Sequence, residues 1–338
     1  MKCNVLRWPR QSYHASQLRM NDSADATALC CAECGNDGGV SLKSCKSCML
    51  VKYCNPTCQR NHWLTHKKTC KIKAAELRDE ALFKDPPAKD DCPICFLPMP
   101  VMLLCCVSLP PATISSVPIY NAIANEELAD LMETEGYYPC CGKSICRGCI
   151  HSFIESGNID QCPYCKAERR LKTYEEMFEE IMERVEANDP ISICLLANSY
   201  HNGVNGYQQD HARAIELYAR AAELGCSKAH SSLGDIYADD VGDLKKAKFH
   251  FENAAMAGHE LARYNLGILE NNSGNMERAV KHWIIAASSG EYHSMQVLIT
   301  LFEQGLVSRD VIESTLTSYN NSCAEMKSEA RNAAIRIH

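Results

Sequence analysis

The chain has 338 residues, of which 46% are hydrophobic and 23% charged, as in ordinary globular proteins, and its length suffices for two or three domains. Its net charge of −7 excludes a protein that coats nucleic acid or an anionic membrane through bulk charge. The longest apolar run, residues 101–107, is much shorter than the ~18–20 residues that cross a bilayer. The sequence therefore predicts no helical membrane span.

Cysteine is the unusual component, at 22 residues, and 18 of these lie within residues 30–70 and 92–165. Many form C-x-x-C pairs with histidine nearby, the spacing at which two thiolates bind one tetrahedral metal ion. A secreted disulfide-rich domain also concentrates cysteine, but no apolar signal segment opens this sequence. We expect a reduced, intracellular zinc protein, located in the cytoplasm or the nucleus.

The composition predicts an ordered series of segments along the chain. Residues 1–29 have no periodic pattern and are expected to be a disordered lead-in. Met177, Ile181 and Val185 share one face of a predicted helix between Thr173 and Asn188. The other predicted segments are a cysteine block at 30–70, a charged and partly helical linker at 71–90, a second cysteine block at 91–170, a linker helix at 171–190, a helical array at 191–325 and a C-terminal tail at 326–338.

The predicted helical array contains an internal repeat. The residues Ala214, Tyr218, Ala221, Gly225 and Ala229 have counterparts 33 residues later, and most recur after a further 32 residues. Such a period is typical of an α-solenoid of paired helices. Small residues allow paired helices to approach, the aromatic residue fills the gap, and the glycine ends its helix in the left-handed conformation.

The repeat extends in both directions. Leu196 matches Leu233 in an earlier unit, whereas Thr315 replaces the aromatic residue in a degenerate last unit that must face water. The stretches AIELYARAAELGCSKA, KAKFHFENAAMAGHELA and RAVKHWIIAASSGEYHS resemble the Sel-one-like (SLR) repeats, which are relatives of tetratricopeptide repeats, over residues 191–325. The resemblance implies a protein-binding scaffold without catalysis of its own.

The first cysteine block contains eight candidate ligands in four pairs. Four pairs suit two closed tetrahedral sites, with the first and third pairs on one ion and the second and fourth on the other. This interleaving ties together distant segments of a domain too small to fold on its core alone. Cys30 and His62 are alternatives, but spacing favours Cys31 and His66, and it predicts a helix over 56–70. The predicted ligands are Cys31, Cys34, Cys45, Cys48, Cys54, Cys58, His66 and Cys70.

The stretch YCNPTCQRNHWLTHKKTC in this block resembles a MYND zinc finger. The resemblance implies a domain that binds short peptide motifs of partner proteins, with Gln59 and Trp63 lining or supporting the peptide groove. Basic residues from Arg60 to Lys73 are read as a solvated helix face, so nucleic acid is not an expected partner.

The second block carries the patterns CPIC, CCGKSICRGC and CPYC, which predict two structural zinc ions in a cross-brace. The predicted ligands are Cys92, Cys95, Cys140, Cys141, Cys146, Cys149, Cys162 and Cys165. The block resembles a RING domain in which Lys143 stands at the usual histidine position, and we infer that Cys140 supplies the missing ligand. Cys105 and Cys106, within the 44-residue loop before Cys140, are alternative ligands but are expected to be buried as small apolar residues.

The resemblance to RING ubiquitin ligases implies a domain that positions a ubiquitin-conjugating enzyme and contributes no catalytic residue of its own. In that family, positions matching Ile94 and Pro163 hold the conjugating enzyme, and the position of Lys166 steadies its ubiquitin-loaded state.

The expected fold class is therefore multidomain, with two small zinc-stabilised α+β cross-brace domains, four Zn²⁺ ions in all, followed by an all-α helical-repeat solenoid. The order of domains is also similar to that of RING/SLR-repeat proteins of microalgae. It favours a RING-type ubiquitin ligase that selects substrates through its finger and repeats. The alternative is a non-catalytic interaction scaffold, and enzymatic activity stays open between them. A MYND-containing methyltransferase is not favoured, because no cofactor-binding catalytic domain accompanies the finger.

Overall fold

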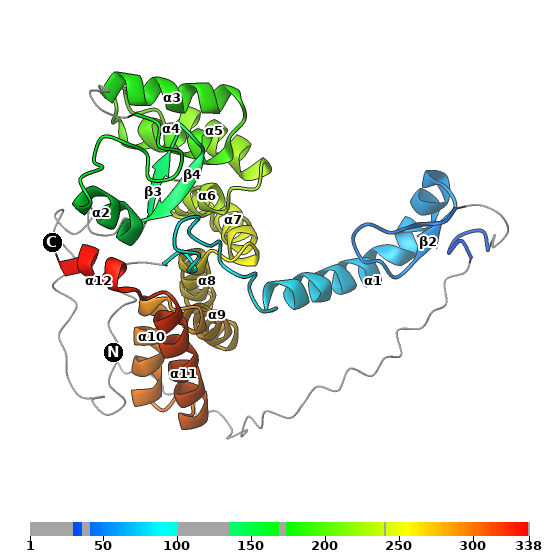
Figure 1. The fold of residues 1–338 in the computed structure, drawn as a ribbon. Helices are drawn as coiled ribbons and strands as arrows, with labels where there is room; N and C mark the ends of the chain where they lie inside the picture. Colours follow the sequence, from blue (N-terminus) through cyan, green and yellow to red (C-terminus); the bar gives the residue numbers. More distant parts are fainter. Residues whose placement is uncertain (1–29, 36–40, 101–134, 169–173, 240, 337–338) are drawn as a thin grey trace. The chain divides into compact units, whose positions relative to one another are not determined.

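The computed structural model describes residues 30–35, 41–100, 135–168, 174–239 and 241–336 (Figure 1). The predicted lead-in, the apolar run at 101–107, Cys105 and Cys106 lie outside the described residues. The chain divides between Asp79 and Glu80 into two compact units. Among the described helices, none has both the length and the apolar character needed to cross a membrane.

The first unit is built from a short hairpin and the start of a long helix. Strands β1 (Lys43–Ser44) and β2 (Lys52–Tyr53) pair antiparallel, and helix α1 (Pro56–Leu82) follows. Asn55 caps this helix, because its Oδ1 accepts a hydrogen bond from the Cys58 backbone N–H at 2.8 Å. Pro56 suits the first helical position, which needs no N–H donor. The helix predicted over 56–70 is confirmed, and it continues through the expected linker to Leu82.

The second unit begins with the second cysteine block. Strands β3 (Glu135–Tyr138) and β4 (Lys143–Cys146) form an antiparallel hairpin, and helix α2 (Arg147–Glu155) follows directly. Isolated bridges between Asp91 and Pro98 and between Gln161 and Glu168 enclose the two outer C-x-x-C turns. The hairpin, these bridges and the start of α2 therefore position the cysteine pairs of this block.

A run of antiparallel helix pairs forms the rest of the second unit (Figure 1). The glycines predicted to end the Ala-Ala helices, Gly225, Gly258 and Gly290, have φ of 94°, 89° and 92°, which confirms the left-handed caps. The helices are α3 (Tyr174–Glu186), α4 (Pro190–Asn202), α5 (His211–Glu223), α6 (Ser227–Asp239), α7 (Leu244–Met256), α8 (Glu260–Asn272), α9 (Met276–Ser288), α10 (Tyr292–Glu303), α11 (Arg309–Glu325) and α12 (Glu329–Arg336).

The predicted linker helix corresponds to α3. Its residues Ile181 and Val185 pack into the core of the first helix pairs, whereas the Met177 side chain lies outside the described residues. The helix ends before Asp189, whose carboxylate caps α4 by accepting from the backbone N–H groups of Ile191 and Ser192, both at 3.0 Å. The linker helix is thus followed directly by the first helix of the repeat array.

Two of the helix pairs pack a glycine against an aromatic ring. Phe251 lies against Gly234 and Trp283 against Gly267, and both aromatic side chains are buried. The last unit differs, as the sequence indicates, but Thr315 is buried rather than facing water. Tyr319, one turn later on α11, is fully buried and packs in this core, so the unit retains an aromatic residue at a shifted position.

The last residue of α1 and the segment after it lie against the repeats. Leu82 is fully buried in a cluster with α7 and α8, and its carbonyl accepts a hydrogen bond from the guanidinium of Arg263 at 2.7 Å. Further along, the Lys89 ammonium donates to the Ser289 carbonyl at 2.7 Å and pairs with Glu260 at 3.2 Å. The segment expected to be a simple linker is therefore part of the core of the second unit.

The second cysteine block also contacts helices from both ends of the array: α3 and α4 near its beginning and α12 after its end. The Tyr137 hydroxyl lies 2.9 Å from Ser192 Oγ on α4, and Arg184 Nε on α3 donates to the Pro139 carbonyl at 2.8 Å. The residues expected to form a C-terminal tail include α12, which packs on α2 (Figure 1). Block and array therefore form one compact body rather than separate modules on a string.

Candidate zinc centres

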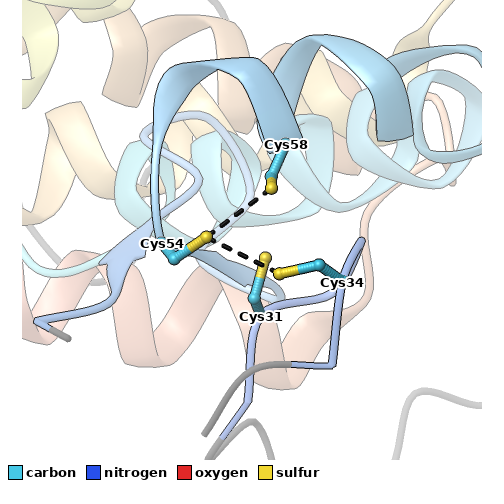
Figure 2. Close-up of side chains that lie close together, drawn as sticks. All are labelled: Cys31, Cys34, Cys54 and Cys58. Atoms are coloured by element: carbon cyan, nitrogen blue, oxygen red, sulfur yellow. Dashed lines mark hydrogen bonds between the residues drawn. The ribbon is translucent and has the colours of Figure 1, made fainter. Parts of the chain in front are cut away.

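Site 1 contains two cysteines from a turn before β1, one that directly follows β2 and one in the first turn of α1: Cys31, Cys34, Cys54 and Cys58. Their side chains converge on one point (Figure 2), with the Cys54 sulfur 3.7 Å from that of Cys34 and 3.5 Å from that of Cys58. The first and third pairs of the block are thus brought together, as interleaving predicts.

Site 2 contains the second and fourth pairs, Cys45, Cys48, His66 and Cys70, all of them buried. The Cys45 and Cys70 sulfurs are 3.7 Å apart, and His66 Nε2 lies 3.2 Å from the Cys48 sulfur. Because α1 contributes ligands to both sites, the helix locks the two clusters into one small body. Cysteine side chains and Tyr53 make up most of its buried core.

This geometry decides between the alternative zinc ligands of the first block. Cys30 is exposed, whereas Cys31 is buried within site 1. His62 instead has its Nδ1 2.9 Å from the Tyr53 hydroxyl and its ring stacked on that of His66, with centroids 5.5 Å apart. His62 therefore supports the ring of the site 2 histidine and takes no place in the cluster.

The second block repeats the interleaved arrangement. Site 3 consists of Cys92, Cys95, Cys146 and Cys149, and the Cys95 and Cys146 sulfurs are 3.8 Å apart. Site 4 consists of Cys140, Cys141, Cys162 and Cys165, with sulfur separations of 3.6 Å for Cys140–Cys165 and 3.9 Å for Cys141–Cys162. Lys143 is exposed, and the adjacent Cys140 stands in the cluster as the sequence indicates.

These spacings fit zinc. Four sulfurs bound tetrahedrally at ~2.3 Å from one ion are about 3.8 Å apart, whereas a disulfide needs about 2.05 Å. Every described cysteine is free of disulfide bonds, and the ligand atoms of each cluster lie within 4.8 Å of one another. All four donor sets are complete and closed, which is the chemistry of structural rather than catalytic zinc.

The pKa values of neighbouring thiols in these clusters are shifted in opposite directions, as expected where several thiolates would have to share a small volume. Backbone N–H groups, that of Cys34 first, lower the pKa of Cys31 to about 6. The neighbouring thiol of Cys58 is the main reason that the pKa of Cys54 rises to about 12, and burial raises that of Cys70 to about 12. Without a cation, close-packed thiols cannot all ionise, so zinc binding would expel the protons that remain.

The residues predicted to contact a conjugating enzyme differ in their exposure to solvent. Ile94, in the turn between Cys92 and Cys95, is 36% exposed, whereas Pro163 is buried. The Lys166 ammonium donates to the Pro163 carbonyl at 2.9 Å and lies 4.0 Å from the centre of the Phe153 ring. Phe153, on α2, is a neighbour of this group that sequence reasoning missed, because no spacing rule links it to the cysteines.

The predicted peptide-groove residues, Gln59 and Trp63, are exposed and one turn apart on α1. The Trp63 ring meets His66 of site 2 edge to face, with centroids 6.5 Å apart. The indole thus packs against one candidate ligand of site 2, while 39% of the residue stays exposed to solvent.

Comparison with protein families gives two matches. The model of the MYND finger matches residues 31–70, and that of the Sel1 repeat matches residues 190–226, 227–259 and 261–291. A SET and MYND domain-containing protein of Dictyostelium discoideum is 42% identical over 50 residues, 13% of this chain and 9% of that protein. The ERAD-associated E3 ubiquitin-protein ligase component HRD3B of Arabidopsis thaliana is 26% identical over 112 residues, 32% of this chain and 17% of that protein. The chain thus spans only a small part of either relative.

Two similar solved structures are repeat proteins. A Sel1 repeat protein from Oxalobacter formigenes aligns with 56% of this chain and 74% of its own, at 20% identity and a TM-score of 0.41. A protective antigen of uropathogenic Escherichia coli with an SLR fold aligns with 56% of this chain and 43% of its own, at 22% identity and a TM-score of 0.36. By the two family models, and not by these structures, the chain contains a MYND zinc finger at residues 31–70 and three Sel1 repeats within residues 190–291, both of them modules of protein interaction.

Proposed function

We propose that the protein is an interaction adaptor that binds four zinc ions and recruits a ubiquitin-conjugating enzyme through its second cysteine block. The observation that carries the proposal is the interleaving of sites 3 and 4, which leaves Ile94 exposed in the first C-x-x-C turn. A closed zinc cross-brace supplies no nucleophile or base. Its chemistry is to hold two reactants in a productive orientation, which suits ubiquitin transfer between partners.

The surface of the same block supports an apolar partner. Besides Ile94, the side chains of Phe96, Ile154 and Tyr164 are exposed, Phe96 to 76%. Ile159 of the same block is exposed as well, and so many exposed large apolar side chains on so small a domain are typical of a protein with an interaction surface. The likeness to HRD3B, whose name describes a component of a ubiquitin ligase, agrees with this assignment. The finger and the repeats would then select the substrate.

A second candidate is a scaffold whose second block is purely structural. The positions of Pro163 and Lys166 favour it. The proline is buried, and the lysine ammonium donates a hydrogen bond to the proline carbonyl and lies over the Phe153 ring. The Pro163 side chain is then not accessible to a partner, and the exposed Lys166 would have to give up its contacts within the block to reach one. The two candidates differ in a single measurable property, the transfer of ubiquitin.

The test is an autoubiquitination assay of the full-length, zinc-loaded chain with a panel of conjugating enzymes. We expect ubiquitin chains from the wild type and at least a roughly tenfold loss for Ile94→Ala, since a buried interface side chain contributes about 1.4 kcal/mol or more. The matched control is Ile72→Ala, a residue of the same type that is 54% exposed on α1 and lies outside the second block. Silence across the panel, from protein that retains its zinc, would favour the scaffold.

Zinc content is measured separately by native mass spectrometry. Four ions per chain are expected, one for each cluster, and two would show that one of the blocks does not bind metal. Because the count does not depend on ubiquitin chemistry, it separates a failed zinc assignment from a failed ligase assignment.

A further inference from the structure

A buried arginine from the end of the chain reaches the thiols of site 3. Arg331 lies on α12 and is only 5% exposed. Its Nε is 3.4 Å from the Cys146 sulfur and one Nη is 3.5 Å from the Cys95 sulfur. These are two of the four candidate zinc ligands of the site, and they come from two different segments of the block.

The guanidinium uses all of its hydrogen-bonding capacity at this position. Besides the two sulfurs, it donates to the carbonyls of Pro98 at 2.8 Å, Met326 at 2.7 Å and Leu97 at 3.3 Å. An arginine side chain has five N–H donors, and the five bonds account for them. The three carbonyls fix the orientation of the planar, forked guanidinium group, so that its remaining N–H groups point at the two sulfurs.

Charge explains why a cation is buried there. Within the described residues, the Arg331 guanidinium donates its hydrogen bonds to sulfurs and carbonyls and not to a carboxylate. Burying its positive charge without a negative charge nearby would be costly in free energy. Four thiolates around one Zn²⁺ carry a net charge of about −2, which makes a zinc-loaded site 3 the missing counter-charge. Hydrogen bonds to ligand atoms are also the usual means by which an outer shell holds a metal site together.

The local backbone is shaped to admit this side chain. Gly148, on α2 between two ligands of site 3, is buried against α12. A Cβ at this glycine would lie 2.6 Å from both Cγ and the backbone N of Arg331 and 2.7 Å from its Cα. Glycine is therefore the residue that lets α12 approach closely enough for the guanidinium to reach the sulfurs.

We propose that Arg331 is a positioning residue of the site 3 zinc centre, so that α12, beyond the repeats, completes the second zinc domain and controls how tightly it retains its metal. The fork neutralises two thiolates that belong to different chain segments, and thereby holds the first and third cysteine pairs around one ion. The inference concerns metal retention alone and stands whether or not the block recruits a conjugating enzyme.

The test measures zinc release from the full-length chain to a chromogenic chelator, ion by ion. For Arg331→Ala we expect one of the four ions to leave roughly 10–100-fold faster, the usual loss when an outer-shell partner is removed, while the others keep wild-type kinetics. Gly148→Ala, which displaces α12 but keeps the arginine, should accelerate the same ion. The matched control is Arg309→Ala on α11, whose side chain is 74% exposed, and all of its ions should behave as in the wild type.

A spectroscopic measurement separates positioning from general stability. In the Co²⁺-substituted chain, loss of N–H donors makes the site 3 sulfurs more electron-rich, so the thiolate-to-cobalt charge-transfer band of one site should move to lower energy in Arg331→Ala. Unchanged release, equal acceleration of all ions, or faster release without a band shift would each overturn the proposal. If Arg331→Ala does not fold, Arg331→Lys carries the same test, since it retains the charge but loses the fork.

Discussion

Alanine at Gly267 tests the close packing of the repeats. This glycine lies in α8 against the indole of Trp283 on α9. A Cβ added there would be 2.3 Å from the indole Nε1 and 2.6 Å from Cδ1. Trp283 is only 3% exposed and is surrounded by the core of the last repeats, so the ring has no open space into which it can retreat.

Two effects of opposite sign set the magnitude. Alanine in place of glycine within a helix gains about 1 kcal/mol of intrinsic propensity. Overpacking a close-packed core costs about 1–3 kcal/mol, and an overlap of this depth places the cost at the upper end. We therefore expect a net loss of about 2 kcal/mol, which lowers Tm by roughly 4–8 °C for a cooperative unit of this size.

Urea unfolding of the zinc-loaded chain, followed by circular dichroism at 222 nm, measures this loss. The double variant with Trp283→Leu should show a favourable coupling of at least about 1 kcal/mol, because the smaller side chain makes room for the new methyl group. Gly225→Ala is the control, since its φ of 94° penalises alanine although nothing lies within 4 Å. If Gly267→Ala were more stable than the wild type, the gain in helix propensity would outweigh any clash with the indole, and the packing argument would be wrong.

Three further perturbations have defined outcomes. Burial alone would raise the pKa of Glu270, but hydrogen bonds from Lys248, Arg278 and Asn275 outweigh it and lower the pKa to about 2. The stabilisation that Glu270 provides over Glu270→Gln, at most about 3 kcal/mol, should therefore be constant above pH 5 in chemical denaturation and decline as the pH falls towards 2. Leu82→Ala should lose about 2–5 kcal/mol in the same assay, because the side chain is fully buried against α7 and α8, whereas Leu64→Ala, at 87% exposure, should change little. Chelation at neutral pH should remove the zinc but leave most of the 222 nm signal, since α4 to α11 contain no cluster residue; a collapse of that signal would show that the repeats need the metal to fold.

Local spacing explains what the sequence could reveal. A gap of two residues between cysteines directs both thiolates to one metal ion, and five of the eight ligand pairs have this spacing. The order of the pairs predicts their interleaving, whereas the pairing of Cys140 with Cys141 rests on the resemblance to RING domains. The repeat is equally visible, because a helix pair of about 33 residues must reuse the same small and aromatic positions to bury the same face. The cap glycines and the helix after Asn55 are consequences of backbone geometry and are readable for the same reason.

Contacts between distant segments follow no such rule. Arg331 meets Cys95 across 236 residues, and Lys89 meets the Ser289 carbonyl across 200. Each is a single charged residue in an ordinary polar context, with no periodicity to single it out. Tyr319 is similar, since its aromatic ring takes its place in the core one turn away from the position that the repeat predicts. Such contacts depend on where whole elements pack, which a single sequence does not show.

The separation of Arg331 from site 3 also has a consequence for the timing of synthesis. The residue follows Cys146 by 185 positions, which a ribosome translates in roughly 10–40 s at about 5–20 residues per second. Throughout that interval the nascent chain presents four thiols without the guanidinium that neutralises them. Zinc captured early is then held by the cysteines alone, and the repeats are made before the second zinc domain is complete. If Arg331 secures the ion as proposed, firm binding at site 3 has to wait until α12 has been synthesised.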